Sequence, residues 1–227
     1  MKAVLASIRP RHCTNIANKK KSLEVRKTTP KLETPFKVYI YCTSGKPYMV
    51  YNDDSWCPGY TVLNNWSEKR AEEVWELMNG KVIGEFVCDY IFSIDIQWMA
   101  HDELPGSPVE TWLEWENAPE EYVSTEDIAK AACLAWSEIE GYIGASDGVY
   151  CWHISALKIY DEPKPLSDFT PRCNCMIGDG ECDHRKVGCS YQQADYNPDG
   201  SLNVVMCGKR MTRAPQSWCY VEVIGKC

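Results

Sequence analysis

The alternation of apolar and polar positions along the chain predicts short strands with a few helices between them. In the first half, Pro10 suits the first turn of a helix that runs to about Asn18. Ser67 is a good N-cap for a second helix, whose apolar spacing continues to Met78 before Gly80 ends it. Strands are predicted at residues 4–8, 23–26, 36–43 and 81–94, the last as one long strand or as two.

The second half of the chain continues this mixture. Residues 103–119 contain three prolines and predict a loop. Helices are expected at about 124–135 and 139–143, and strands at 150–160 and 218–224. Pro163 and Pro165 are expected to end the first of these strands. Turn residues predict insertions at about 44–66 and 171–213. The whole pattern predicts a single α+β domain over residues 1–227, built as a partly closed mixed β-barrel with peripheral helices.

A small group of charged residues lies at the second predicted strand. Glu24 and Arg26 are two apart, so both side chains should point to one face, and Lys21 lies in the turn just before them. Up to Lys31 the chain carries nine Lys and Arg residues and one acidic residue, Glu24. This grouping suits a phosphate, a nucleobase edge or a proton transfer. Two plainer interpretations stay open: a structural ion pair between Glu24 and Arg26, and a solvated lysine turn.

The run of residues 19–26, KKKSLEVR, resembles the G-x-K-x-x-E-x-R signature that follows a strand and a helix in the ASCH family of PUA-like domains. Lys21, Glu24 and Arg26 match the signature. Lys19 stands at the position of the glycine, and Asn18 is expected to supply the left-handed conformation instead. Four later pieces look like family strands in the family's order, the last two like those of phage-type members: KVYIYCT, GKVIGEFVCDYI, CWHISALKIYDEPKPL and PQSWCYVEV. The resemblance implies a PUA-like fold of phage or bacterial type with a Cys-rich insertion.

The resemblance also implies two functions. Some members hydrolyse an acylated cytidine nucleoside and at least one other is described as a ribonuclease, so RNA or a nucleotide-like ligand is the expected partner. In the deacylating members a lysine acts with a threonine and a strand glutamate. Lys21 takes the lysine position, Glu24 stands at the threonine position, and Glu85 is the candidate strand carboxylate. Lys21 would then act as a base or activate water, while Glu85, with a pKa raised by burial, would donate a proton.

For a binding module, Arg9, Lys21, Glu24 and Arg26 are expected to form a basic cleft. Trp152 and Trp218 could form a wall on which bases stack, although packing in the core is the more common role of a tryptophan. His153 should point away from the face of Trp152, toward solvent or a pocket, and His12 is interpreted as a surface or packing histidine. The sequence therefore favours RNA or nucleotide binding, with a hydrolase of modified nucleosides or RNA as the alternative. A protein-interaction module that docks a host partner is the second alternative.

A cluster of soft metal ligands lies in the second predicted insertion. Five such residues occur within seventeen positions and are separated by glycines: Cys173, Cys175, Cys182, His184 and Cys189. Structural zinc prefers four cysteines, or three cysteines and a histidine. A loop with so few apolar residues cannot bury a core of its own, so a structural zinc ion is predicted. Reduced, unliganded cysteines are the alternative.

Charge and hydropathy limit the partners and the cellular location that can be expected. The net charge of −8 argues against broad, nonspecific nucleic-acid binding and is concentrated in an acidic middle region, which could contact a protein partner. The most apolar stretch, residues 82–100, is interrupted by Glu85, Asp89 and Asp95, so no membrane segment is expected. The apolar run near the N-terminus is too short for a signal peptide, which predicts a cytoplasmic protein. The thirteen cysteines should then be thiols or metal ligands.

Overall fold

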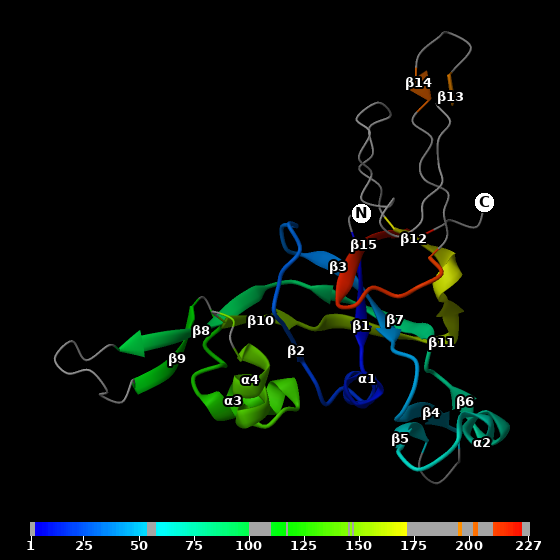
Figure 1. Ribbon diagram of the computed structural model, residues 1–227, viewed down its shortest axis with the longest axis horizontal. Coiled ribbons are helices and arrows are strands. Elements are labelled where there is room, and N and C mark those ends of the chain that lie inside the picture. The colour runs from blue at the N-terminus through cyan, green and yellow to red at the C-terminus, as the bar shows by residue number, and fades with distance from the viewer. Residues whose placement is uncertain are drawn as a thin grey trace.

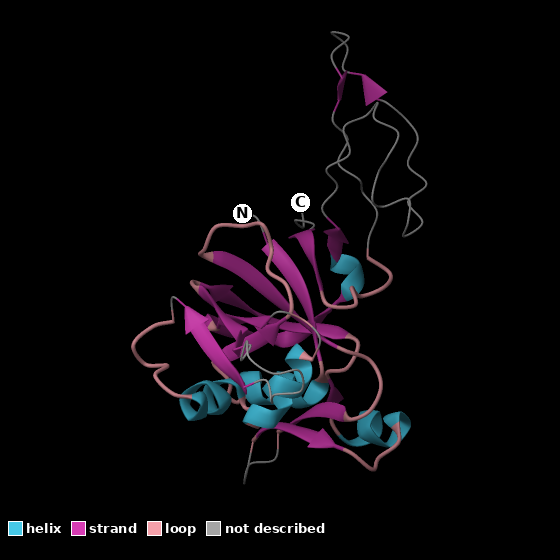
Figure 2. Ribbon diagram, turned by 60° about the vertical axis from the view of Figure 1, so that its left-hand side comes forward, coloured by secondary structure: helices cyan, strands magenta, loops and turns pink. Residues whose placement is uncertain are grey.

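The computed structural model describes residues 3–53, 58–99, 110–116, 118–144, 146, 148–171, 195–196, 202–203 and 211–223. Within these residues the fold combines several separate sheets with short helices, which confirms the predicted α+β class. Figure 1 shows α1, α3 and α4 gathered below the strands of the two larger sheets, and Figure 2 shows the same grouping from another side. No helix in the described ranges is both long and apolar enough to cross a membrane.

The larger sheet holds six strands in the order β11-β7-β3-β1-β15-β12. At its centre β1 (Ala3–Ile8) and β3 (Phe36–Cys42) run parallel, and the other neighbours are antiparallel. All residues of β1 are buried, because α1 (Pro10–Ala17) covers one face of the sheet. The other face is covered by residues near η1 (Leu166–Asp168) and by Met211. Cover on both faces explains why β1 reads as a nearly continuous apolar run.

The second sheet has the order β2-β10-β8-β9 and is antiparallel throughout. Its strands are β2 (Leu23–Arg26), β10 (Gly148–His153), β8 (Ile91–Met99) and β9 (Glu110–Glu116). Helices α3 (Thr125–Ala132) and α4 (Trp136–Ile143) cover one face with a second apolar cluster. No strand pairing joins the two large sheets within the described residues, so the barrel is only partly closed.

The first predicted insertion forms structure of its own. β4 (Tyr48–Asn52) pairs with β5 (Gly59–Leu63) and with β6 (Glu76–Leu77) in a three-stranded sheet. The helix that starts after Ser67 is α2 (Glu68–Val74), and it ends earlier than predicted. The physical reason is that the apolar Leu77 pairs with β4 as a strand residue, so tertiary contact overrides the helical spacing. In Figure 1 this sheet and α2 lie together at the lower right.

Two other predictions, one of a loop and one of a strand, need correction. The predicted loop at 103–119 contains β9, which pairs with β8, because its prolines flank the strand and do not lie inside it. Residues 81–94 contain β7 (Lys81–Cys88) and the start of β8, which confirms the alternative of two strands. Residues 150–160 are also divided, into β10 and β11 (Ser155–Pro165). β11 continues through Pro163 and Pro165 because it is an edge strand, where missing N–H groups are tolerated.

The described C-terminal elements agree with the predicted closing strand. β15 (Trp218–Val223) pairs with β1 and with β12 (Phe169–Pro171). Two short strands, β13 (Asp195–Tyr196) and β14 (Leu202–Asn203), form a small separate ladder. Most of the second predicted insertion lies outside the described residues.

The turn between α1 and β2 differs from its prediction in one residue. Lys19, at the glycine position of the signature, adopts the left-handed conformation with φ of 57°, whereas Asn18 has φ of −83°. Asn18 instead uses its amide side chain on β5: Nδ2 donates to the Tyr60 carbonyl at 2.8 Å, and Oδ1 accepts from the Tyr60 N–H at 3.3 Å. The backbone shape that glycine provides in the signature is therefore present here, on a lysine.

Candidate functional site

The three signature residues Lys21, Glu24 and Arg26 form one buried ionic cluster. Their exposed fractions are 3%, 6% and 6%. Glu24 lies between the two cations, with Oε1 2.9 Å from Arg26 Nη2 and Oε2 3.5 Å from Lys21 Nζ. Glu24 and Arg26 therefore share one face of β2, as strand alternation predicted. They also form the buried ion pair that the sequence analysis left open as a structural interpretation.

The cluster connects β2 to three other parts of the fold. Lys21 Nζ donates to the carbonyl of Ala132 at 2.6 Å, at the C-terminus of α3, where the helix dipole favours a cation. Arg26 Nη2 donates to the Ser7 carbonyl on β1 at 2.9 Å. Arg26 Nη1 donates to the Ser217 carbonyl just before β15 at 3.3 Å. The two sheets and α3 thus meet through these side chains.

The electrostatics of the cluster keep Glu24 ionised. Burial alone would raise the pKa of Glu24, but the charges of Lys21, Arg26 and His12 outweigh it and lower that pKa. The cluster then contains two positive groups and one negative group. It carries a net positive charge at a place where water is excluded.

His12 on α1 lies next to this cluster. Burial lowers the pKa of His12, an effect that the charge of Glu24 partly offsets, so the imidazole is neutral near neutral pH. Three buried polar atoms near Glu24 make no hydrogen bond within the described residues: His12 Nδ1, Arg26 Nε and Trp152 Nε1. Trp152 is the cross-strand partner of Glu24 in the β2–β10 pair. Because buried polar atoms are nearly always paired in proteins, this group is suited to a polar ligand.

Two further arginines surround the start of α1. Arg9 is the N-cap residue, and its side chain is exposed. Arg11, also exposed, lies 3.9 Å from Glu138 on α4, a contact that water weakens greatly. Both arginines contribute to the electrostatic field that shifts the pKa of His12. They therefore form an exposed basic rim beside the buried cluster.

The aromatic residues near the cluster differ in how far they are buried. Trp152 is fully buried, with its ring centroid 5.9 Å from that of Phe36 and 6.1 Å from that of Trp218. Of the two roles considered for Trp152, packing in the core is confirmed and a stacking surface is contradicted, because its ring fills the core between the sheets. Trp218 is only half-buried, and it follows the Ser217 carbonyl that Arg26 contacts. Tyr150, the cross-strand partner of Arg26, is 37% exposed.

Two predicted site residues lie away from the cluster. His153 points to the face opposite Trp152, where it stacks on Tyr90 at 4.3 Å and its Nδ1 lies 2.6 Å from Asp89 Oδ1. Glu85 on β7 pairs with Tyr39 on β3, and Tyr39 belongs to the apolar cluster on the face of the large sheet that α1 does not cover. The structure therefore does not bring Glu85 to Lys21 and Glu24.

The surroundings of Glu85 also differ from the prediction for a proton donor. Lys37 Nζ lies 2.7 Å from Oε1, and the Tyr160 hydroxyl donates to Oε2 at 2.6 Å. Burial would raise the pKa of Glu85, but these hydrogen bonds and the lysine charges lower it. The expected raised pKa is thus contradicted.

The predicted zinc ligands lie outside the described residues, namely Cys173, Cys175, Cys182, His184 and Cys189. In the part of the chain that the structure describes, no group of three or more His, Cys, Asp or Glu side chains is placed to hold a metal ion. The zinc site stays a prediction.

Three residues near the cluster were missed or undervalued by sequence reasoning. Tyr150 could have been found, since strand alternation places it on the face of Trp152. His12 and Arg11 lie on α1, and their place beside β2 follows from how the helix packs, which no local pattern reveals.

The chain was compared with protein families, with curated proteins and with solved structures, and only the solved structures gave matches. No family model matches the chain, and no curated protein matches it. Among solved structures, the chain is similar to ASCH from Zymomonas mobilis and to a tyrosine-to-phenylalanine mutant of that protein. The mutant structure has 12% identity and a TM-score of 0.45, covering 100% of this chain and 92% of that one. The other has 12% identity and a TM-score of 0.43, covering 99% and 89%.

Glu24 and Arg26 lie on β2 and Lys21 lies in the turn just before it, after strand β1 and helix α1, as the sequence predicted. Any activity or ligand has to follow from the chemistry of the site itself.

Proposed function

We propose that this ASCH/PUA-like module binds RNA beside the cluster of Lys21, Glu24 and Arg26. The observation that carries the proposal is the net positive charge of this buried cluster next to an exposed basic rim. A desolvated positive charge attracts an anion more strongly than a surface charge does, because little water screens it. This local charge also accounts for nucleic-acid binding by a chain whose net charge is −8.

In this proposal the exposed residues touch the RNA and the buried ones position them. Arg9 and Arg11 contact the phosphate backbone, next to the neutral imidazole of His12. Trp218 and Tyr150 flank Arg26 and are accessible enough for bases to stack on them. Lys21, Glu24 and Arg26 hold these elements in place.

The geometry favours binding over hydrolysis. Glu24 has a lowered pKa and holds no proton to donate near neutral pH. Lys21 Nζ is engaged by a backbone carbonyl and a carboxylate, and Glu85 lies on a different face. No observation favours a protein partner at the acidic residues of α2. We further propose a cytoplasmic location, since the described cysteines are free thiols, as is usual in a reducing compartment.

Fluorescence anisotropy with a short single-stranded RNA tests the proposal. Because Arg9 and Arg11 are exposed, the double substitution Arg9→Gln/Arg11→Gln should leave the fold intact and weaken RNA binding by about tenfold at low salt. It should also make binding less dependent on salt, with a slope that is smaller by about 0.7 for each phosphate that the arginines no longer neutralise.

Arg70→Gln is the matched control, because Arg70 is an exposed arginine on α2, stacked over Trp66 at 4.5 Å. Its RNA affinity should equal that of the wild type. Equal affinity of the double variant and the wild type would place RNA binding elsewhere, and no binding by the wild type would refute the proposal.

A further inference from the structure

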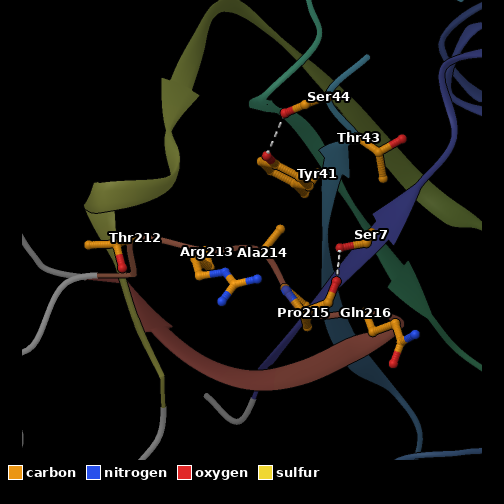
Figure 3. Close-up of a pocket in the computed structure, with 9 residues that line it drawn as sticks. All are labelled: Ser7, Tyr41, Thr43, Ser44, Thr212, Arg213, Ala214, Pro215 and Gln216. Carbon is orange, nitrogen blue, oxygen red and sulfur yellow. Dashed lines mark hydrogen bonds between the residues drawn. The ribbon is translucent and has the colours of Figure 1, made fainter. Parts of the chain in front are cut away.

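A second polar site lies on the face of the large sheet that α1 does not cover. It is a pocket of about 460 Å³ where the parallel strands β1 and β3 end, and we call it the β1–β3 pocket. Ser7, Tyr41, Thr43 and Ser44 line it from the strand side, and residues 212–216 line it from the segment before β15. Figure 3 shows these two groups facing each other, with the guanidinium of Arg213 pointing toward the strand side of the pocket, where Ser7 lies. Small-molecule sites commonly have volumes of about 300–1,000 Å³.

The side chains of the β1–β3 pocket select for a negatively charged, hydroxylated ligand. None of its nine lining residues is acidic, in a chain with a net charge of −8. Arg213 is exposed, and within the described residues no carboxylate forms an ion pair with it. The other polar groups are five hydroxyls and one amide, from Ser7, Tyr41, Thr43, Ser44, Thr212 and Gln216. A guanidinium binds phosphate oxygens through two parallel hydrogen bonds, and neutral hydroxyls suit both phosphate and sugar.

The walls of the β1–β3 pocket are held in place by hydrogen bonds. The Ser7 hydroxyl donates to the Pro215 carbonyl at 2.6 Å, and the Ser7 N–H donates to the Ser217 carbonyl at 2.8 Å. Further along the strand side, the buried amide of Asn79 donates to the carbonyls of Thr43 and Gly45 at 3.2 and 2.6 Å. A site whose walls are fixed in advance loses little entropy when a ligand binds.

We propose that the β1–β3 pocket binds a sugar phosphate, either free or as part of a nucleoside monophosphate. Arg213 contacts the phosphate, with the hydroxyls of Thr43 and Thr212 as further donors. The hydroxyls of Tyr41 and Ser44, whose oxygens lie 3.4 Å apart, contact the sugar. The β1–β3 pocket adjoins the signature cluster, since Ser7 presents its side chain to the pocket while its carbonyl accepts from Arg26. The ligand proposed for the pocket goes beyond the proposed RNA binding.

Calorimetric titration of the full chain with four probes tests this inference: ribose, inorganic phosphate, ribose 5-phosphate and cytidine 5′-monophosphate. We expect ribose 5-phosphate to bind at least about tenfold more tightly than inorganic phosphate, because only the former uses both groups of contacts. Tighter binding of the nucleotide than of ribose 5-phosphate identifies a nucleotide as the natural source. Equal binding of the two identifies the free sugar phosphate.

Two substitutions locate the site. Arg213→Gln should weaken ribose 5-phosphate binding at least about tenfold, and Thr43→Val should weaken it less. Arg70→Gln should change nothing, and Arg213→Gln should leave RNA affinity unchanged. The inference is overturned if neither sugar phosphate binds, if inorganic phosphate binds as tightly as ribose 5-phosphate, or if Arg213→Gln binds ribose 5-phosphate as tightly as the wild type does.

Discussion

Glu24→Gln is expected to lower the free energy of unfolding by about 3–5 kcal/mol, because it leaves the buried charges of Lys21 and Arg26 without a counter-charge. The two cations hold α3, β1 and the segment before β15, so their repulsion would loosen contacts between the sheets. Urea unfolding followed by circular dichroism measures the effect.

The same substitution should change how stability depends on pH. The pKa of Glu24 in the folded chain lies below its ordinary value of 4.5. A lowered pKa contributes stability that is fully present above the unfolded value and is lost as the pH falls through the folded value. The wild type should therefore lose stability below about pH 4.5, and Glu24→Gln should lack this part of the loss.

Glu73→Gln is the control for this prediction, because Glu73 makes an exposed 3.8 Å contact with Lys69 on α2. It should cost less than about 1 kcal/mol. If Glu24→Gln were equally mild, the buried charges of Lys21 and Arg26 would not depend on Glu24 as their counter-charge.

Trp152→Ala is expected to lower the free energy of unfolding by about 3–5 kcal/mol, through the cavity left beside Phe36 and Trp218. Tyr150→Ala, two residues earlier on β10, removes a ring that is 37% exposed and should cost much less. The RNA affinities should follow the opposite order: Tyr150→Ala should weaken binding about fivefold or more, because a base can no longer stack on its ring. Thermal unfolding and anisotropy on the same samples measure both effects.

The two substitutions separate core packing from RNA binding, because Trp152→Ala should mainly lower stability and Tyr150→Ala should mainly lower RNA affinity. A mild effect of Trp152→Ala on stability would contradict its place in the core. Unchanged RNA affinity of Tyr150→Ala would remove Tyr150 from the binding surface while leaving the basic rim open to its own test.

The parts of the fold that the sequence predicts well depend on local signals. The start of α1 follows from Pro10, and the common face of Glu24 and Arg26 follows from strand alternation. The parts that it predicts poorly depend on distant contacts. Leu77 joins β4 as a strand residue, and β11 tolerates Pro163 because it is an edge strand. Neither the pairing partner nor the edge position can be read from a local pattern.

The same reasoning explains the errors at the site. The resemblance places Glu85 with the signature residues because Glu85 lies on a predicted barrel strand. However, the face on which a strand residue lies depends on register, and Glu85 lies opposite Tyr39 in the β3–β7 pair. The burial of Lys21 could not be predicted either, since its partner, the Ala132 carbonyl, is more than a hundred positions away along the chain. The β1–β3 pocket brings together three segments that are also far apart in sequence.

Photo-crosslinking with a short RNA that contains 4-thiouridine, followed by mass spectrometry of the peptides, tests the central claim most directly. RNA bound beside the signature cluster should crosslink to peptides that contain Tyr150, Trp218 or the start of α1, and Arg9→Gln/Arg11→Gln should reduce the yield. Crosslinks confined to α2 and its sheet, or a yield that the double variant leaves unchanged, would contradict RNA binding at this site.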